Sequence, residues 1–275
     1  MMPAGANGEA GGAAVDDLRR EFATLTVENL SMHFGGLAAL DGVDFTLYNM
    51  DLVGLIGPNG AGKTTAFNVV TGIYRPASGR VIFQGQDITG MKSYQIARLG
   101  LARTFQNIRL FRGLSVLDNV AVAYHRHGRS GLVASVLRTK AFRHEERRIR
   151  ERAMEFLRLF KLESRASALA SSLPHGDQRR LEIARALAAE PRLLLLDEPA
   201  AGLNRAETAQ LMDLIRWIRD EFHITVLLIE HDMRFVMGIC QRITVLDHGR
   251  VIASGTPAEV RRDPAVIEAY LGEAK

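Results

Sequence analysis

A glycine-rich stretch at residues 57–65, Gly-Pro-Asn-Gly-Ala-Gly-Lys-Thr-Thr, constrains the fold of this chain most. Glycines let successive backbone N–H groups turn inward without Cβ clashes, which makes a concave site for an anion. An apolar run at 51–56 precedes the stretch, and a helix-forming segment at 66–70 follows it. A buried strand, a glycine loop and a helix N-terminus in this order predict a site for the phosphates of a nucleoside triphosphate.

Two side chains of the stretch have predicted roles of their own. Lys63 would place its ammonium on the terminal phosphates, and the Thr64 hydroxyl would take a coordination position on Mg²⁺. A plain turn is the alternative interpretation. It leaves the flanking strand and helix unexplained.

Composition and charge argue against three other classes of protein: nucleic-acid-binding, disulfide-stabilised and membrane-spanning proteins. The 275 residues, 47% of them hydrophobic, suffice for one sizeable core with room for an inserted subdomain. The net charge of +4 gives no strong case for nucleic acid. The single cysteine, Cys240, cannot form an intrachain disulfide and has apolar neighbours, which predicts a buried, inert thiol. No run of 18 apolar residues exists, and the Gly/Ala-rich start, 1–14, indicates a disordered tail and not a secretory signal.

Short strands are predicted on both sides of the loop. Apolar and polar residues alternate at 25–30 and 43–47, with a Gly-Gly break between them, which is typical of an antiparallel pair. After the loop, 78–85 has the pattern of a hairpin strand, and 93–99 is able to form a helix.

From residue 114 to 169 the pattern becomes helical, with apolar residues at three- and four-residue spacing in 132–137 and 153–160. Residues 138–152 between them interleave arginines with glutamates. This segment is either a solvated helix with internal ion pairs or a contact for an acidic partner or lipid headgroups. The α/β pattern then returns, with strands predicted at 193–196, 225–229 and 242–246 and helices at 179–189, 205–222, after 231 and at 265–271.

Chemically active side chains end two of these strands. Asp197 and Glu198 follow four leucines, and ligands of open α/β sheets bind at the carboxyl ends of strands. Asp197 is placed to act on Mg²⁺ through water, and Glu198 can accept a proton from an attacking water. His231 ends the next strand, where it could hold the γ-phosphate and the water in line. A structural hydrogen bond is the alternative role for His231.

These motifs together resemble the ATP-binding subunit of an ABC transporter, over residues 25–255. The family's Walker A loop falls on 57–64 and its Walker B strand on 193–197. The resemblance makes Glu198 the catalytic glutamate and His231 the switch histidine.

The resemblance also implies roles that the residues alone do not. Thr-Phe-Gln-Asn at 104–107 matches the Q-loop, so Gln106 would sense the γ-phosphate and Mg²⁺ and connect them to the membrane subunit. Phe34 falls where the family stacks an aromatic ring on adenine, with a core position as the alternative. The implied ATP contacts are Phe34, Gly57, Pro58, Asn59, Gly60, Ala61, Gly62, Lys63, Thr64, Thr65 and Gln106. The implied catalytic residues are Lys63, Glu198 and His231, and the implied metal ligands are Thr64, Gln106 and Asp197.

The signature segment departs from the usual Leu-Ser-Gly-Gly-Gln. This chain has Leu173, Pro174, His175, Gly176 and Asp177, which would contact the ATP held by a partner subunit. Pro174 lacks the serine hydroxyl, and Asn204 stands where an aspartate is usual. Three segments of the chain are similar to segments of the ATPases of branched-chain amino-acid importers. They read Leu-Pro-His-Gly-Asp-Gln-Arg-Arg-Leu-Glu, Ala-Arg-Thr-Phe-Gln-Asn-Ile-Arg-Leu-Phe and Pro-Ala-Ala-Gly-Leu-Asn.

The resemblance implies an α/β fold: a P-loop NTPase (RecA-like) core with an antiparallel β subdomain and an inserted all-helical subdomain. We expect a disordered tail at 1–21, the core at 22–106 and 179–255, the helical subdomain at 107–178 and a tail helix at 256–275.

The implied cofactors are ATP and Mg²⁺. The implied partners are a second, related but different ATP-binding subunit, two membrane-spanning permease subunits and a periplasmic or surface substrate-binding protein. No nucleic acid is expected. The chain would be peripheral, on the cytoplasmic face of the inner membrane, with residues 108–111 as the expected contact for a permease helix.

Alternatives remain open at this point. Similar cassettes serve importers of urea, amides or organic acids and exporters of lipids, and soluble ABC ATPases act on nucleic acid. A phosphate-loop kinase would not explain the Gln106, signature and His231 series together. A metal site at His125 and His127 is disfavoured because no further ligands lie nearby in the sequence.

Overall fold

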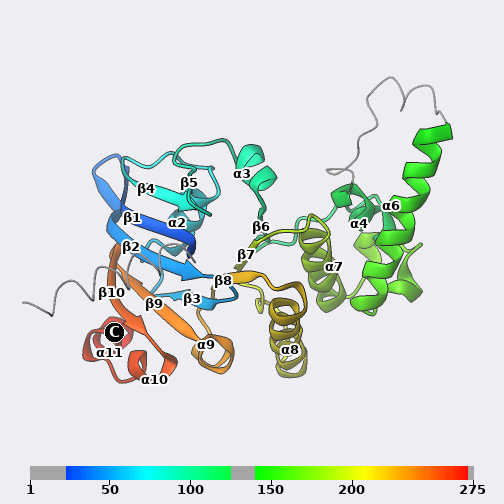
Figure 1. Ribbon diagram of the computed structural model, residues 1–275. Coiled ribbons are helices and arrows are strands. Elements are labelled where there is room, and N and C mark those ends of the chain that lie inside the picture. Colours follow the sequence, from blue (N-terminus) through cyan, green and yellow to red (C-terminus); the bar gives the residue numbers. More distant parts are fainter. Residues whose placement is uncertain (1–22, 125–139, 272–275) are drawn as a thin grey trace, which may run out of the picture. The chain divides into compact units, whose positions relative to one another are not determined.

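The computed structural model describes residues 23–124 and 140–271 (Figure 1). They form two compact units. The first unit contains the described residues up to Ile96 and those from Arg216 onward, and the second contains the described residues between 97 and 215. The boundary crosses helix α8 (Arg205–Phe222). The domain division expected from the sequence has other boundaries and stays a prediction. The expected tail at 1–21, the apolar segment 132–137 and the histidines at 125 and 127 lie outside the described residues.

The first unit contains an antiparallel sheet with the strand order β2-β1-β4-β5. Alternation buries Leu25 and Val27 of β1, as the sequence predicts. Leu30 is buried as well, beyond a register shift at which Asn29 has a φ of 47°. The turn between β1 and β2 contains Gly35, whose φ of 58° favours glycine. The strands are β1 (Ala23–Phe34), β2 (Leu37–Tyr48), β4 (Ser78–Phe83) and β5 (Gln86–Asp87).

The same unit contains the strands that carry the glycine loop, in the order β10-β9-β3-β8. Strand β3 (Leu52–Ile56) pairs in parallel with both β8 (Thr225–Ile229) and β9 (Arg242–Asp247). All residues of β3 and β8 are buried, which explains their continuous apolar runs. Strand β10 (Arg250–Gly255), antiparallel to β9, was not predicted. Further helices are α2 (Lys63–Val70), α3 (Ser93–Leu99, which ends beyond this unit), α9 (Met233–Ile239), α10 (Pro257–Val260) and α11 (Pro264–Leu271).

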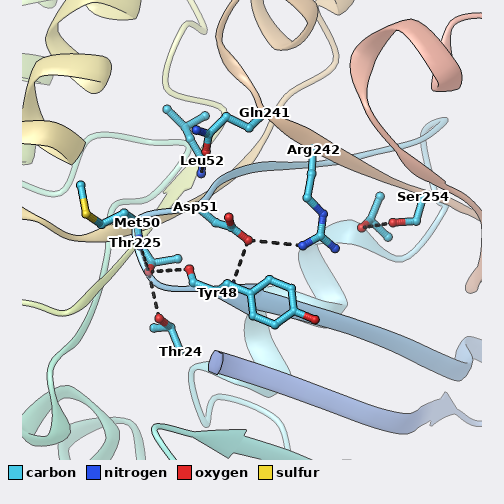
Figure 2. A network of polar contacts seen from close by, with 10 residues as sticks. Thr24, Tyr48, Met50, Asp51, Leu52, Thr225, Gln241, Arg242 and Ser254 are labelled. Atoms are coloured by element: carbon cyan, nitrogen blue, oxygen red, sulfur yellow. Dashed lines mark hydrogen bonds and ion pairs between the residues drawn. The ribbon is translucent and has the colours of Figure 1, made fainter. Parts of the chain in front are cut away.

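A polar network joins the two sheets of this unit at the start of the parallel strands (Figure 2). The buried Thr225 hydroxyl accepts a hydrogen bond from Met50 N (3.2 Å) and donates to Tyr48 O (3.0 Å). Asp51 accepts from Tyr48 N (2.9 Å) and lies 3.4 Å from the guanidinium of Arg242. The turn between β2 and β3 is therefore held by β8 and β9, which fixes where β3 and its loop begin.

The second unit combines two parallel strands, β6 (Leu101–Arg103) and β7 (Leu193–Asp197), with helices. Helix α4 (Val116–Tyr124) packs against α6 (Lys140–Leu159) and α7 (His175–Leu187) (Figure 1). The prediction that the helix after the signature begins at residue 179 is wrong. Pro174 occupies the N-cap with a φ of −55°, so His175, Gly176 and Asp177 already form the first turn.

Helix α6 is amphipathic. Its buried residues, Ile149, Ala153 and Leu157, recur at a spacing of four residues, and its arginines and glutamates are exposed or half-exposed. Arg150 pairs with Asp118 of α4 at 3.1 Å. Among the described residues, none of the helices combines the length and apolar character needed to cross a membrane.

Candidate nucleotide-binding site

The loop after β3 can be built only with glycine at two points. Gly57 and Gly62 have φ angles of 148° and 101°. A Cβ on Gly57 would lie 2.0 Å from Leu246 O, and a Cβ on Gly62 would lie 2.5 Å from Ala39 O. The loop therefore packs directly on the backbone of β9 and β2, which holds it in one shape.

The side chain of Lys63 lies across this loop. It is largely buried, and its Nζ donates to Gly57 O (2.6 Å) and Pro58 O (2.7 Å). Helix α2 begins here with Gly62 as N-cap, so no side chain of that residue satisfies the first-turn N–H groups, and the first turn has no acidic residue. Exposed Thr64 follows. An ammonium, the N–H donors of a helix N-terminus and an accessible hydroxyl fit a triphosphate with its magnesium ion.

His231 lies at the same edge of the sheet as the loop. Strands β3 and β8 run in parallel with Leu55 opposite Ile229, so residues that follow their carboxyl ends emerge side by side. The His231 side chain is mostly exposed, and its backbone N–H donates to the buried carboxylate of Glu230 (3.2 Å).

Phe34 is accessible. It retains 44% of its surface and packs edge-on against Tyr74, with ring centroids 5.3 Å apart. The ring is thus not part of the core, and a flat apolar group is able to stack on it.

In the second unit, β7 presents two carboxylates with different surroundings. Asp197 is buried and pairs with the guanidinium of Arg103 on β6 at 2.7 Å. Glu198 has a φ of 44° and accepts a hydrogen bond from Gln106 Nε2 at 2.9 Å. The structure therefore brings Gln106 and Glu198 together. Arg103 was missed by the sequence reasoning; its position three residues before Gln106 was the available signal.

The signature segment lies against the loop that precedes α8. A Cβ on Gly202 would meet the ring of His175 at 3.2 Å, and a Cβ on Gly176 would meet Glu207 at 3.1 Å. Asp177 pairs with Arg180 at 3.0 Å and more loosely with Arg165 at 3.7 Å. Leu173 is buried, and Pro174 offers no hydroxyl at the start of the helix.

Asn204, the other departure from the family pattern, has a local role. Its side-chain oxygen accepts from Ala206 N (2.9 Å) and Glu207 N (3.0 Å), and Glu207 in return accepts from Asn204 N (2.9 Å). These reciprocal bonds cap α8. The cap explains why α8 begins where the sequence predicts.

A pocket of about 650 Å³ adjoins the segment after Gln106. Its walls are apolar apart from two guanidinium groups: Arg109 lies 4.1 Å from the ring centroid of Phe105, and Arg185 lies 5.3 Å from that of Phe111. Burial lowers the pKa of Arg185, which nearby Glu182 partly offsets. The lining residues are Phe105, Arg109, Leu110, Phe111, Val122, Ala123 and Arg185.

Comparison with known proteins identifies the class. A family model described as ABC transporter matches residues 40–201, so the chain belongs to the ABC transporter family. A second model, described as branched-chain amino acid ATP-binding cassette transporter, matches residues 250–275.

Individual proteins within this family are similar to the chain over most of its length. The high-affinity branched-chain amino acid transport ATP-binding protein LivG of Escherichia coli K12 is 49% identical over 250 residues, 91% of this chain and 98% of LivG. BraF of Pseudomonas aeruginosa, described in the same words, is 48% identical with the same shares. A crystal structure of an ABC transporter's ATP-binding cassette in its ADP conformation matches with a TM-score of 0.79, at 31% identity, over 91% of this chain and 99% of that one. The predicted fold class and the resemblance are thereby confirmed.

Proposed function

We propose that this protein is the ATP-hydrolysing subunit of an ABC importer for branched-chain or related small amino acids. The observation that carries the proposal is the 49% identity to a branched-chain amino acid transport ATP-binding protein over 91% of the chain. Importers of urea, amides or organic acids and lipid exporters are the alternatives, because this subunit does not touch the cargo.

In the proposed reaction, the loop and Lys63 bind the phosphates of ATP, and Phe34 stacks on the adenine. Glu198 orients the attacking water and accepts its proton, while His231 holds the water in line with the γ-phosphate. Mg²⁺, held by Thr64, Gln106 and Asp197, would neutralise charge on the phosphates. The Gln106–Glu198 contact of 2.9 Å supports a shared role for these two residues.

Hydrolysis would require a second ATP-binding subunit, which we infer to be a related but different chain. Residues 173–177 of each subunit would meet the ATP held by the other. The first turn of α7 contains His175, Gly176 and Asp177, so its N–H groups and helix dipole are the groups available for the phosphate in place of a serine hydroxyl. Closing and opening of the pair would drive transport.

The pocket beside Gln106 is the proposed contact for a helix of one of two permease subunits. Exposed Phe111 and the two arginines suit an apolar helix that carries a carboxylate. The chain would then be peripheral on the cytoplasmic face of the membrane. A separate substrate-binding protein would deliver the amino acid to the complex.

The proposal is tested by reconstituting the chain with its permease and partner ATPase in proteoliposomes. We expect ATP-dependent uptake of radiolabelled leucine, supplied with the cognate binding protein, to exceed uptake of urea or acetamide. ATP hydrolysis accompanied by uptake of urea alone would retain the ATPase and reject amino-acid import.

A further inference from the structure

Two oppositely charged side chains of α7 are almost completely buried. Arg179 and Glu182 each retain 1% of their surface, and Arg179 Nη1 lies 2.8 Å from Glu182 Oε2. Burying two charged groups is costly because both lose their hydration, and an ion pair offsets this cost only if further hydrogen bonds satisfy its remaining donors and acceptors. The further hydrogen bonds of this pair therefore indicate its structural role.

In the part of the chain that the structure describes, the other hydrogen bonds of this pair go to one short piece of backbone. Arg179 Nη1 donates to Phe105 O (2.9 Å), and its Nη2 donates to Gln106 O (3.0 Å). Glu182 Oε1 accepts from Arg109 N (3.1 Å). Within the described residues the buried Nε of Arg179 meets no acceptor, so the two Nη atoms make the hydrogen bonds of this guanidinium. One ion pair thus fixes backbone groups at Gln106 and on both sides of it.

We propose that Arg179 and Glu182 form a positioning pair for ATP hydrolysis, which places Gln106 against Glu198. The Gln106 side chain is exposed, and its amide reaches Glu198 Oε2 at 2.9 Å. The segment is held before Gln106 by Thr104 N, which donates to Leu195 O (2.9 Å), and further on by Asn119, which bonds the N and O of Phe111. Between these points, the pair on α7 bonds the backbone of Phe105, Gln106 and Arg109. A displacement of about 1 Å in a catalytic constellation can cost about 10²-fold in rate.

The pair also connects Gln106, the signature segment and the pocket, which all belong to the second unit. It belongs to α7, whose first turn is part of the signature segment, and it holds the backbone of Phe105 and Arg109, which line the pocket. A partner helix seated in the pocket would therefore act on Gln106 and on α7 through the same bonds. The inference rests on the proposed roles of Gln106 and Glu198.

The test replaces the pair by apolar residues of similar volume, Arg179→Met with Glu182→Leu, in the full-length chain. Such replacement of a buried ion pair is often neutral for stability. Because Phe105 O, Gln106 O and Arg109 N lose their partners here, we expect a lower melting temperature but a chain that is folded at the assay temperature. Its ATP dissociation constant should stay within twofold of the wild type. The kcat of ATP hydrolysis should fall at least tenfold. The matched control, Arg150→Met, breaks a surface ion pair of the same unit and should leave kcat unchanged.

A double-mutant cycle distinguishes positioning from general structural support. If the pair acts through Gln106, adding Gln106→Ala to the apolar pair should lower kcat no further than the more severe of the two changes alone. A stable apolar-pair variant with kcat within twofold of wild type, or effects that simply multiply, would overturn the inference.

A second variant serves if the apolar pair does not fold. Arg179→Lys keeps the charge beside Glu182, but an ammonium cannot span two carbonyls as the guanidinium fork does. We expect a folded protein with kcat lowered at least threefold, and an unchanged kcat would reject the inference. Glu198→Gln, measured in parallel, reports on the underlying assignment: if it turns over ATP like the wild type, the proposed function fails independently of Arg179.

Discussion

Two consecutive carboxylates at the end of β7 show that the surroundings of a residue determine the role it can take. Asp197 is buried against Arg103, while Glu198 adopts a left-handed backbone conformation and meets Gln106. A φ above zero is costly for a residue with a side chain and persists mainly where the surrounding structure requires it, often at functional sites. This contrast supports separate roles for the two groups, electrostatic for Asp197 and proton-accepting for Glu198.

The first prediction concerns Glu198. Glu198→Gln removes the proton acceptor but keeps the size of the side chain and a hydrogen-bonding partner for Gln106. We expect steady-state phosphate release to fall at least about 10²-fold while ATP binding, measured by calorimetry, is retained. Turnover near the wild-type rate would contradict the assignment.

A second prediction concerns Arg103. In Arg103→Met, Asp197 would remain buried without its counter-charge, which typically costs about 3–5 kcal/mol in the free energy of unfolding. Urea denaturation measures the loss. The double variant Arg103→Met with Asp197→Leu should regain most of it, and an equally unstable double variant would show that the ion pair is not the cause.

Tyr124 provides a prediction of pH dependence. Burial, reinforced by Glu190, raises the pKa of Tyr124 to about 12. Because the pKa is higher in the folded than in the unfolded state, the stabilisation is complete below pH 10 and is lost as the pH rises towards 12. The difference in absorbance at 295 nm between wild type and Tyr124→Phe should titrate near pH 12, and a midpoint near pH 10 would refute the burial.

At the scale of elements, sequence predicts best where the cause is local. The strands at 225–229 and 52–56 are recognised by their continuous apolar runs, and α8 by its cap at Asn204. Strand β6 was missed because three residues carry too little pattern. The Arg179–Glu182 pair was missed because its contacts lie more than 70 residues away along the chain, whereas a charged helix by itself predicts a solvated face.

The network at the start of β8 supports a prediction about stability. Thr225→Val removes the hydroxyl that bonds Met50 N and Tyr48 O. Tyr48 O keeps its bond from Asp51 N (3.1 Å), but Met50 N would lose its acceptor, at a cost of about 1–3 kcal/mol. Thr225→Ser keeps the hydroxyl and should cost clearly less. Thermal unfolding of both variants decides; equal melting temperatures would show that the hydroxyl contributes little.

At the scale of the whole molecule, the predicted site residues divide between the two units. The phosphate loop and His231 belong to the first, and Gln106, Asp197, Glu198 and the signature segment belong to the second. Lys63 and the phosphate loop, proposed to bind the nucleotide, are therefore carried by one compact body, and Glu198, proposed to accept the proton of the attacking water, by the other. A change within one body need not disturb the other, and this is the basis for expecting separable effects on binding and turnover.

The pocket of the second unit gives a prediction for the assembled transporter. Phe111 is half-exposed at its wall, so Phe111→Asp should leave folding and ATP affinity unchanged and place a charge against the proposed permease helix. We expect co-purification with the permease to fall by at least about tenfold, as for loss of an aromatic anchor at an interface. Undiminished co-purification would place the docking surface elsewhere.

The single cysteine has a practical consequence. Cys240 is buried beside Gly54, and burial raises its thiol pKa, so it should react slowly with maleimides. The natural sequence can therefore accept fluorophores at newly introduced surface cysteines, one in each unit, without prior removal of the native thiol. The fluorescence of such dyes would report in real time on changes around each label while ATP is bound and hydrolysed.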